Sequence, residues 1–309
     1  MCMVHQQTVR VFLRGGLGNQ LFQYAAGFAL SERIGSELII DSSLLPIVPH
    51  GKNGVLHRPE EISSFRHKGI MVRDDESSMT RNQNFARLLQ LERMVGDAFG
   101  STALRLLGSV ASETRDLRGH FSKLKIPARI NSYCAHPDFF ASSADALRAQ
   151  IYSLSQPSEF FLTHELRVEK EQPIGIHLRL GDYQNLQHIY GRLTSNYFEK
   201  ALLETSPNDE RQNLWVFSDE PDKAKGILGK KFQNSFFVPS HALSRPLESL
   251  ILLSKMNRKV LSNSTFSWWA AYLGHPKQVK TIFPRPMFAK GGPKEVEGYL
   301  LESWHQVDR

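Results

Sequence analysis

The residues best suited to chemistry follow a short apolar run in the stretch PIGIHLRLGDY. The alternating apolar residues of 174–178 predict a buried strand that ends before Gly181. His177, Arg179 and Asp182 then lie at the carboxyl end of a strand, where open α/β sheets bind ligands. Arginine presents a planar fork of donors to phosphate, and histidine can donate or accept. The set suits an anionic, nucleotide-like ligand, although the spacing equally allows an arginine and an aspartate that merely pair.

Two later strand ends carry further polar residues. In LWVFSDE, Ser218 and Asp219 follow the apolar run 214–217. In KVLSNSTFSWWAAYLG, a strand at 259–261 leads into a helix start that carries Ser264, Thr265 and Phe266. Hydroxyl and backbone N–H groups at a helix start form a ready phosphate site. The alternative for each stretch is that its serines and aspartate only cap the next helix.

A glycine turn near the N-terminus lies between a predicted strand at 8–13 and a predicted helix at 20–34. With a second strand at 37–40, this segment reads as a βαβ unit. Such a turn lets backbone N–H groups approach an anion, which makes Gly16, Gly18 and Asn19 candidate ligand contacts.

This turn resembles a dinucleotide fingerprint, because Asp41 lies about 20 residues downstream, where an acid that binds ribose is expected. The glycines argue against that interpretation. Gly16 and Gly18 are present, but Leu21 occupies the position of the third glycine. We therefore do not expect NAD-type binding.

The rest of the chain predicts two α/β halves that meet near residue 160. Residues 42–78 are irregular, with a short strand at 69–73, and 156–172 is polar and bounded by prolines, as expected of a domain boundary. Three further elements are predicted before that boundary: helices at 84–99 and 142–154, and a strand at 130–135. Beyond it, strands at 174–178, 213–217, 235–238, 258–261 and 279–283 alternate with helices at 195–205, 221–230, 246–256, 265–273 and 294–302. This alternation indicates a mainly parallel, doubly wound sheet.

Composition limits the function classes. The chain has 309 residues, of which 41% are hydrophobic, so disorder is not expected. Its 38 basic and 31 acidic residues give a formal charge of +7, which favours anionic ligands. No dense run of Lys and Arg appears, so a phosphorylated small molecule is a better partner than nucleic acid.

Cysteine usage and hydropathy bear on the compartment. Cys2 and Cys134 have neither metal-ligand spacing nor a disulfide framework, which fits a reducing compartment. The N-terminus lacks the apolar core of a signal peptide, and no stretch approaches the roughly 20 apolar residues of a membrane span. We expect a cytoplasmic protein, with peripheral contact at the inner membrane face left open.

Four stretches together resemble one family. GGLGNQLFQYAAGFAL, IGIHLRLGDY, WVFSDE and NSTFSWWAAYL occur in the order and rough spacing of the alpha-1,2-fucosyltransferases, from residue 10 to about 284. The resemblance implies inverting transfer of L-fucose from GDP-fucose to the 2-hydroxyl of a galactose, without a metal or other cofactor. It also implies a GT-B-like pair of Rossmann-like domains facing a central cleft. We expect residues 1–160 to bind a galactose-containing glycan and residues 161–309 to bind the donor.

In that role, Arg179 is the first candidate for stabilising the leaving diphosphate, supported by Ser264 and Thr265. Asn19 could reach the phosphate or the fucose. We expect His177 and Asp219 to contact the guanosine part and Asp182 to orient Arg179 or His177. Further candidate binding residues are Gly16, Gly18, Ser218 and Phe266. No Asp-x-Asp pair is present, so fixed positive charge would replace a cation.

One departure from the family pattern bears on activity. Many members carry a second arginine where this chain has Leu180, so another base such as Arg14 must compensate or the affinity for the donor falls. The departure motivates an alternative, a catalytically silent protein of the same fold that binds sugar nucleotide or glycan. The sequence names no general base, and it does not indicate an oligomeric state. A surface polysaccharide on a lipid carrier is the expected acceptor context.

Overall fold

The computed structural model describes residues 8–45, 59–72, 109–112, 128–205, 213–274, 280–290, 292 and 297–309. The chain divides into two compact units, Met1–Ser155 and Gln156–Arg309. The expected cleft between them stays a prediction.

The division lies five residues before the expected boundary at 160/161, because residues 156–172 are not a linker. They contain helix α6 (Glu159–Glu171), which packs against α11 (Pro246–Ser254) of the second unit. The Ser158 hydroxyl caps α6 by accepting from the Phe161 N–H at 3.1 Å, and it also bonds the Glu248 carboxylate at 2.5 Å. A cut at 160/161 would therefore divide a capped helix.

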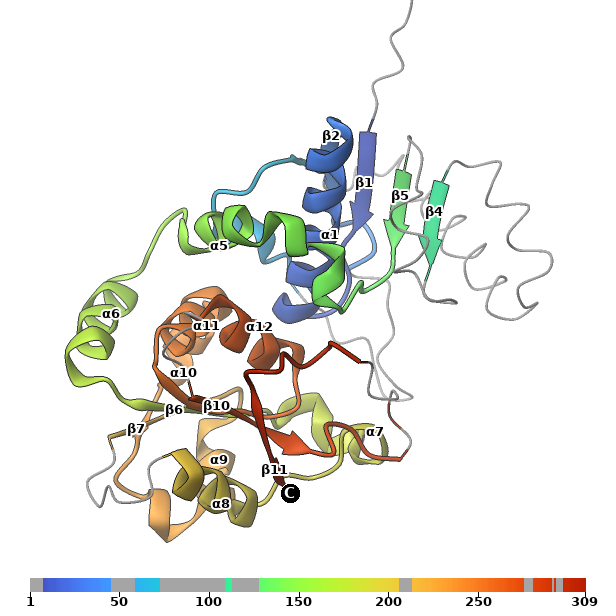
Figure 1. Ribbon diagram of the computed structural model, residues 1–309. Helices are drawn as coiled ribbons and strands as arrows, with labels where there is room; N and C mark the ends of the chain where they lie inside the picture. The colour runs from blue at the N-terminus through green and yellow to red at the C-terminus, as the bar shows by residue number, and fades with distance from the viewer. Residues whose placement is uncertain are drawn as a thin grey trace, which may run out of the picture. The chain divides into compact units, whose positions relative to one another are not determined.

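The first unit has a five-stranded, wholly parallel sheet (Figure 1). Its strands are β1 (Thr8–Phe12), β2 (Glu37–Asp41), β3 (Ile70–Val72), β4 (Ser109–Ser112) and β5 (Ala128–Asn131), in the order β3-β2-β1-β5-β4. Helix α1 (Leu17–Ile34) connects β1 to β2, and the other helices in the described part of this unit are η1 (Ile62–Ser64), η2 (Pro137–Phe139), η3 (Ala141–Ser143) and α5 (Ala144–Tyr152). The predicted βαβ unit is confirmed, with α1 beginning three residues early.

The second unit has a six-stranded parallel sheet in the order β11-β10-β9-β6-β7-β8. The strands are β6 (Ile174–Leu178), β7 (Leu214–Ser218), β8 (Phe236–Phe237), β9 (Arg258–Val260), β10 (Lys280–Arg285) and β11 (His305–Asp308). The connecting helices are η4 (Gly181–Asn185), α7 (Gln187–Tyr190), α8 (Ser195–Thr205), α9 (Pro221–Leu228), η5 (Lys230–Phe232), α10 (Ser240–Leu243), α11 and α12 (Thr265–Leu273). Helices α8 and α9 cover one face, and α11 and α12 the other (Figure 1). The expected α/β class and the doubly wound sheet are confirmed.

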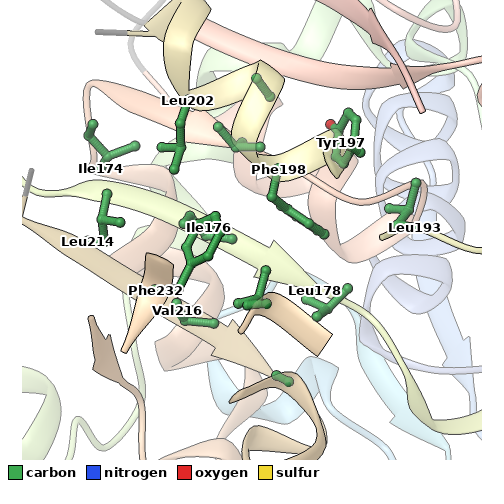
Figure 2. Packing of buried hydrophobic residues seen from close by; sticks show 14 of the residues in the cluster. Ile174, Ile176, Leu178, Leu193, Tyr197, Phe198, Leu202, Leu214, Val216 and Phe232 are labelled. Carbon is green, nitrogen blue, oxygen red and sulfur yellow. The ribbon is translucent and has the colours of Figure 1, made fainter. Parts of the chain in front are cut away.

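The side chains of β6 alternate between the two faces of the sheet, so one strand contributes residues to both the core and the candidate site. Ile174, Ile176 and Leu178 are buried on the face covered by α8, where Phe198 packs over them (Figure 2). Gly175 faces α11 so closely that a Cβ there would lie 2.4 Å from a Leu253 methyl carbon. The odd-numbered residues of β6 therefore face the other side of the sheet, where α11 packs closely. His177 lies on that side together with Gly175.

Three differences from the sequence predictions stand out. The helix predicted at 294–302 is wrong where the structure describes it, since 297–300 form turns. Strand β11 and helix α6 were not predicted. The helix predicted at 84–99 lies outside the described residues. In the part of the chain that is described, no helix has the length and apolar character needed to cross a bilayer.

Lys259 on β9 is fully buried, and its ammonium donates to the Met256 carbonyl at 2.6 Å. Burial lowers the pKa of this lysine from 10.5 to about 7. The unfolded chain therefore holds more protons than the folded one between about pH 7 and pH 10.5, so folding stability rises with pH across that window. The cost of burying this group is fully present below pH 7.

We expect Lys259→Met to stabilise the protein by an amount on the order of a few kcal/mol below pH 7. The gain should shrink as the pH rises and vanish near pH 10.5, where the unfolded lysine also loses its proton. Urea unfolding of both proteins from pH 6 to pH 10 measures this difference. A gain that does not change with pH would contradict the lowered pKa, because it would mean that the buried lysine keeps its proton across this range.

Candidate functional site

The carboxyl edge of the second sheet contains a topological switch point. The chain runs from β6 to β7 and β8 on one side, then returns to β9 on the other side of β6. The parallel registers pair Leu178 with Ser218 and Ile176 with Val260, so the segments after these strands emerge at one edge. Ligands of open α/β sheets bind at such a position. Three of the four stretches singled out in the sequence end there.

Arg179 is held in place by Asp219. Its guanidinium lies 3.0 Å from one oxygen of the Asp219 carboxylate, and the other oxygen accepts the Leu180 N–H at 2.9 Å. Both side chains remain about one-fifth to one-quarter exposed. A partly exposed guanidinium in a fixed position can still present donors to an anionic ligand. Asp219 thus orients the arginine, and its expected contact to the guanosine stays a prediction.

Gly181 makes this arrangement possible. A Cβ at that position would lie 2.4 Å from the Asp219 carboxylate oxygen that pairs with Arg179. Any other residue would push the carboxylate away from the position it holds. The glycine is required here for close approach, since its backbone does not adopt a left-handed conformation.

His177 is buried against α12 within a network of serine hydroxyls. Its Nδ1 lies 2.6 Å from the Ser267 hydroxyl and 3.1 Å from that of Ser262. Ser264 accepts from the Ser267 N–H at 3.1 Å as the N-cap of α12, and its hydroxyl donates to that of Ser267 at 3.2 Å. The Ser262 and Ser267 hydroxyls also lie 3.2 Å apart, so three serine hydroxyls and Nδ1 form one hydrogen-bonded network.

Burial and the positive charge of Arg179 lower the pKa of His177 to about 3. The ring is therefore neutral at any physiological pH, and it can donate one hydrogen bond without adding charge. The Phe266 ring lies 4.7 Å from it at 31°. Arg179 thus supplies positive charge at this edge, and His177 offers a neutral polar contact.

The other candidates of this unit have different roles. Ser218 is buried and accepts the Glu220 N–H at 3.2 Å just before α9, and its expected contact to a ligand stays a prediction. Thr265 and Phe266, the first residues of α12, are partly exposed. The side chain of Asp182 lies outside the described part, and its expected orienting role stays a prediction.

Sequence reasoning missed Ser267 and a pair of stacked tyrosines. Ser267 follows Ser264 by three residues, which is the spacing of a capping interaction and could have indicated the network. Tyr183 and Tyr190 stack with centroids 3.8 Å apart at 5°, and the Arg179 guanidinium lies 5.8 Å from the Tyr183 ring. No pattern in the sequence indicates that these two rings meet.

The glycine turn of the first unit forms a second polar region. Gly15 has φ of +75°, and a Cβ there would lie 2.6 Å from the Asn19 amide nitrogen, so Asn19 folds back over the turn. Gly16 is the N-cap of α1, and Gly18 is buried in its first turn. Asp41 is buried and paired with Arg10 at 2.6 Å, which leaves it in a structural role. The contacts expected of Gly16, Gly18 and Asn19 to a ligand stay predictions.

The departure at Leu180 has a structural basis. The Leu180 side chain belongs to the core of the second unit, where it is buried with Leu178 and Leu193. Arg14, the expected compensating base, belongs to the first unit. Its guanidinium lies 4.7 Å from the Tyr133 ring, and it is mostly buried. Compensation by Arg14 stays a prediction.

Acidic and histidine side chains do not gather into a metal site within the described ranges. The cluster around Arg179 instead combines one guanidinium, one imidazole and several hydroxyls. Such a set suits a phosphate or a sugar better than a divalent cation.

Comparison with known proteins identifies the family. The model of the family described as Glycosyl transferase family 11 matches residues 106–305, which is well over half of the chain. The chain belongs to glycosyl transferase family 11. The suspected family is thereby confirmed, and the Arg179 region lies within the matched part.

Three relatives of this family 11 protein have informative names. It is 26% identical to the O-antigen biosynthesis glycosyltransferase WbnK of Escherichia coli over 94% of this chain and 98% of the relative. It is 23% identical to an alpha-1,2-colitosyltransferase of the same species over 96% and 98%. The galactoside 2-alpha-L-fucosyltransferase Sec1 of Mus musculus is 24% identical over 86% of this chain and 64% of the relative.

Proposed function

We propose that this family 11 glycosyltransferase moves L-fucose from GDP-fucose to the 2-hydroxyl of a galactose, with inversion at the anomeric carbon. The observation that carries the proposal is Arg179, fixed by Asp219 at the switch point of the second sheet. Departure of GDP builds negative charge on the β-phosphate, and a preorganised guanidinium stabilises that charge without reorganisation. Relatives named for 2-fucosyl and alpha-1,2-colitosyl transfer support the linkage.

In this proposal the second unit binds the donor and the first binds a galactose-containing glycan. The neutral His177 ring and the start of α12 contribute polar contacts to the sugar nucleotide, with Thr265 and Phe266 partly exposed beside them. A relative named for O-antigen biosynthesis supports a bacterial surface polysaccharide as the acceptor. Such an acceptor on a lipid carrier would bring the protein to the cytoplasmic face of the inner membrane.

The deciding assay measures GDP release from GDP-fucose with lactose and with type 1 and type 2 glycan acceptors. Acceptor-dependent release with a 2-linked fucosyl product supports the proposal. One relative is named for the transfer of colitose. If the protein turns over GDP-colitose but not GDP-fucose, the donor in the proposal is wrong. Tight GDP binding without any turnover across the panel would instead favour the catalytically silent binding protein.

We expect activity to be unaffected by chelators, because Arg179 and the α12 start supply the positive potential that a cation would otherwise provide. The measurement is the transfer rate before and after EDTA treatment and gel filtration. Full loss of activity that Mn²⁺ or Mg²⁺ restores would contradict this expectation.

A further inference from the structure

Glu61 of the first unit lies beside the glycine turn, fixed there by a buried amide. The Glu61 N–H donates to Oε1 of Gln20 at 2.9 Å. The Gln20 amide nitrogen donates to the carbonyls of Gly15 and Pro59, both at 2.9 Å. Gln20 is fully buried, so its three hydrogen bonds tie residues 59–61 to the turn that follows β1. Glu61 therefore lies next to the carboxyl edge of the first sheet, the edge at which such sheets bind ligands.

The neighbouring Glu60 takes the structural role at this position. Its two carboxylate oxygens accept from the N–H and the hydroxyl of Ser63 at 2.9 and 2.7 Å, which caps the short helix η1. Glu61 is the formal N-cap residue of η1, yet its side chain makes no capping bond. Within the described ranges, no hydrogen bond or ion pair involves the Glu61 carboxylate. The backbone of Glu61 is therefore fixed, while its carboxylate has no polar partner among the described residues.

The environment of this carboxylate favours the neutral form. Burial raises the pKa of Glu61 to about 7, and the adjacent Glu60 carboxylate adds to the increase. Among the described residues, Glu60 is the one charged group that acts on it. A carboxyl group that titrates near neutral pH is well suited to accept a proton from a sugar hydroxyl.

We propose that Glu61 is the general base that activates the acceptor hydroxyl. This assignment rests on the proposed function. As the hydroxyl oxygen forms its bond to the anomeric carbon of fucose, the bond from that carbon to the β-phosphate oxygen breaks. GDP leaves with the electron pair of that bond, and the hydroxyl proton passes to the Glu61 carboxylate. The proton then returns to solvent.

The test compares the pH profiles of wild type, Glu61→Gln and Glu60→Gln in GDP-fucose transfer to lactose. Wild type should lose kcat/KM below about pH 7, as the base becomes protonated. Glu61→Gln should lower kcat by about 10²- to 10⁴-fold and remove this acidic limb. Glu60→Gln should keep its activity and move the limb to lower pH, because a negative neighbour has gone. Asp145→Asn, an exposed carboxylate of the same unit, is the matched control.

Binding and stability measurements separate a chemical role from a structural one. Glu61→Gln should bind GDP as wild type does, and above pH 7 its melting temperature should be equal or higher, because it lacks a carboxylate that burial disfavours. If wild type transfers fucose and Glu61→Gln has the same rate, the assignment is overturned and the proposed function is not. The same holds if Glu61→Gln is slower but keeps the acidic limb unchanged. Wild type that transfers no fucose to any acceptor overturns the proposed function, and the assignment with it.

Discussion

Arg179→Ala is expected to lower kcat for fucosyl transfer by about 10²- to 10³-fold while the protein remains folded. The guanidinium is fixed 3.0 Å from the Asp219 carboxylate and is partly exposed at the switch point. Charge on the leaving diphosphate is largest in the transition state, so the loss should fall mainly on kcat, with a smaller change in KM. Steady-state GDP release at varied GDP-fucose concentration measures both constants.

Two further variants sharpen this result. Arg179→Lys keeps the charge but loses the planar fork, so it should recover only part of the rate. Arg148→Ala removes a surface arginine that pairs with Asp145 at 3.0 Å and should act as wild type. If Arg179→Ala turns over at a near-normal rate with a normal melting curve, Arg179 has no part in the chemistry.

Asp219→Ala should lower kcat by about 10²-fold, although we propose no contact between Asp219 and the diphosphate. The carboxylate orients Arg179 with one oxygen and fixes the Leu180 N–H with the other. Without it, the guanidinium can leave the position in which it meets the phosphate. Asp219→Asn keeps an oxygen for the Leu180 N–H, so it should lie between alanine and wild type. The same steady-state assay measures these rates.

Gly181→Ala tests the same geometry without touching a charge, since its Cβ would lie 2.4 Å from the Asp219 oxygen. It should reduce kcat in the same direction as Asp219→Ala. Asp222→Asn, a 96% exposed carboxylate on α9, is the matched control. A normal rate for Asp219→Ala together with a slow Arg179→Ala would show that Arg179 needs no partner to hold it.

The sequence correctly predicted those elements in which the pattern of apolar residues matches the residues that are buried. Strand β6 alternates apolar residues before a glycine, and α12 begins at the capping Ser264, so both lie where the pattern places them. Helix α6 was taken for a linker because it buries only Phe161 and Val168 and leaves Leu166 exposed. A helix with so narrow an apolar face resembles a polar connection in sequence.

The sequence predicted the residues of the candidate site but not which of them contact one another. The pairing of β6 with β7 brings Asp219 to Arg179, 40 positions away in the chain, and no sequence pattern indicated this contact. The contact expected between Asp219 and the guanosine stays a prediction. The orientation of Leu180 into the core depends on tertiary packing in the same way. Glu61 drew no attention in the sequence, because its unusual environment comes from burial and from the Gln20 amide.

A crystal structure of the protein with GDP tests the central claim most directly. We predict that the Arg179 guanidinium will lie within hydrogen-bond distance, about 3 Å, of a β-phosphate oxygen while it keeps its contact with Asp219. A diphosphate bound elsewhere, with Arg179 engaged by Asp219 alone, would contradict the account.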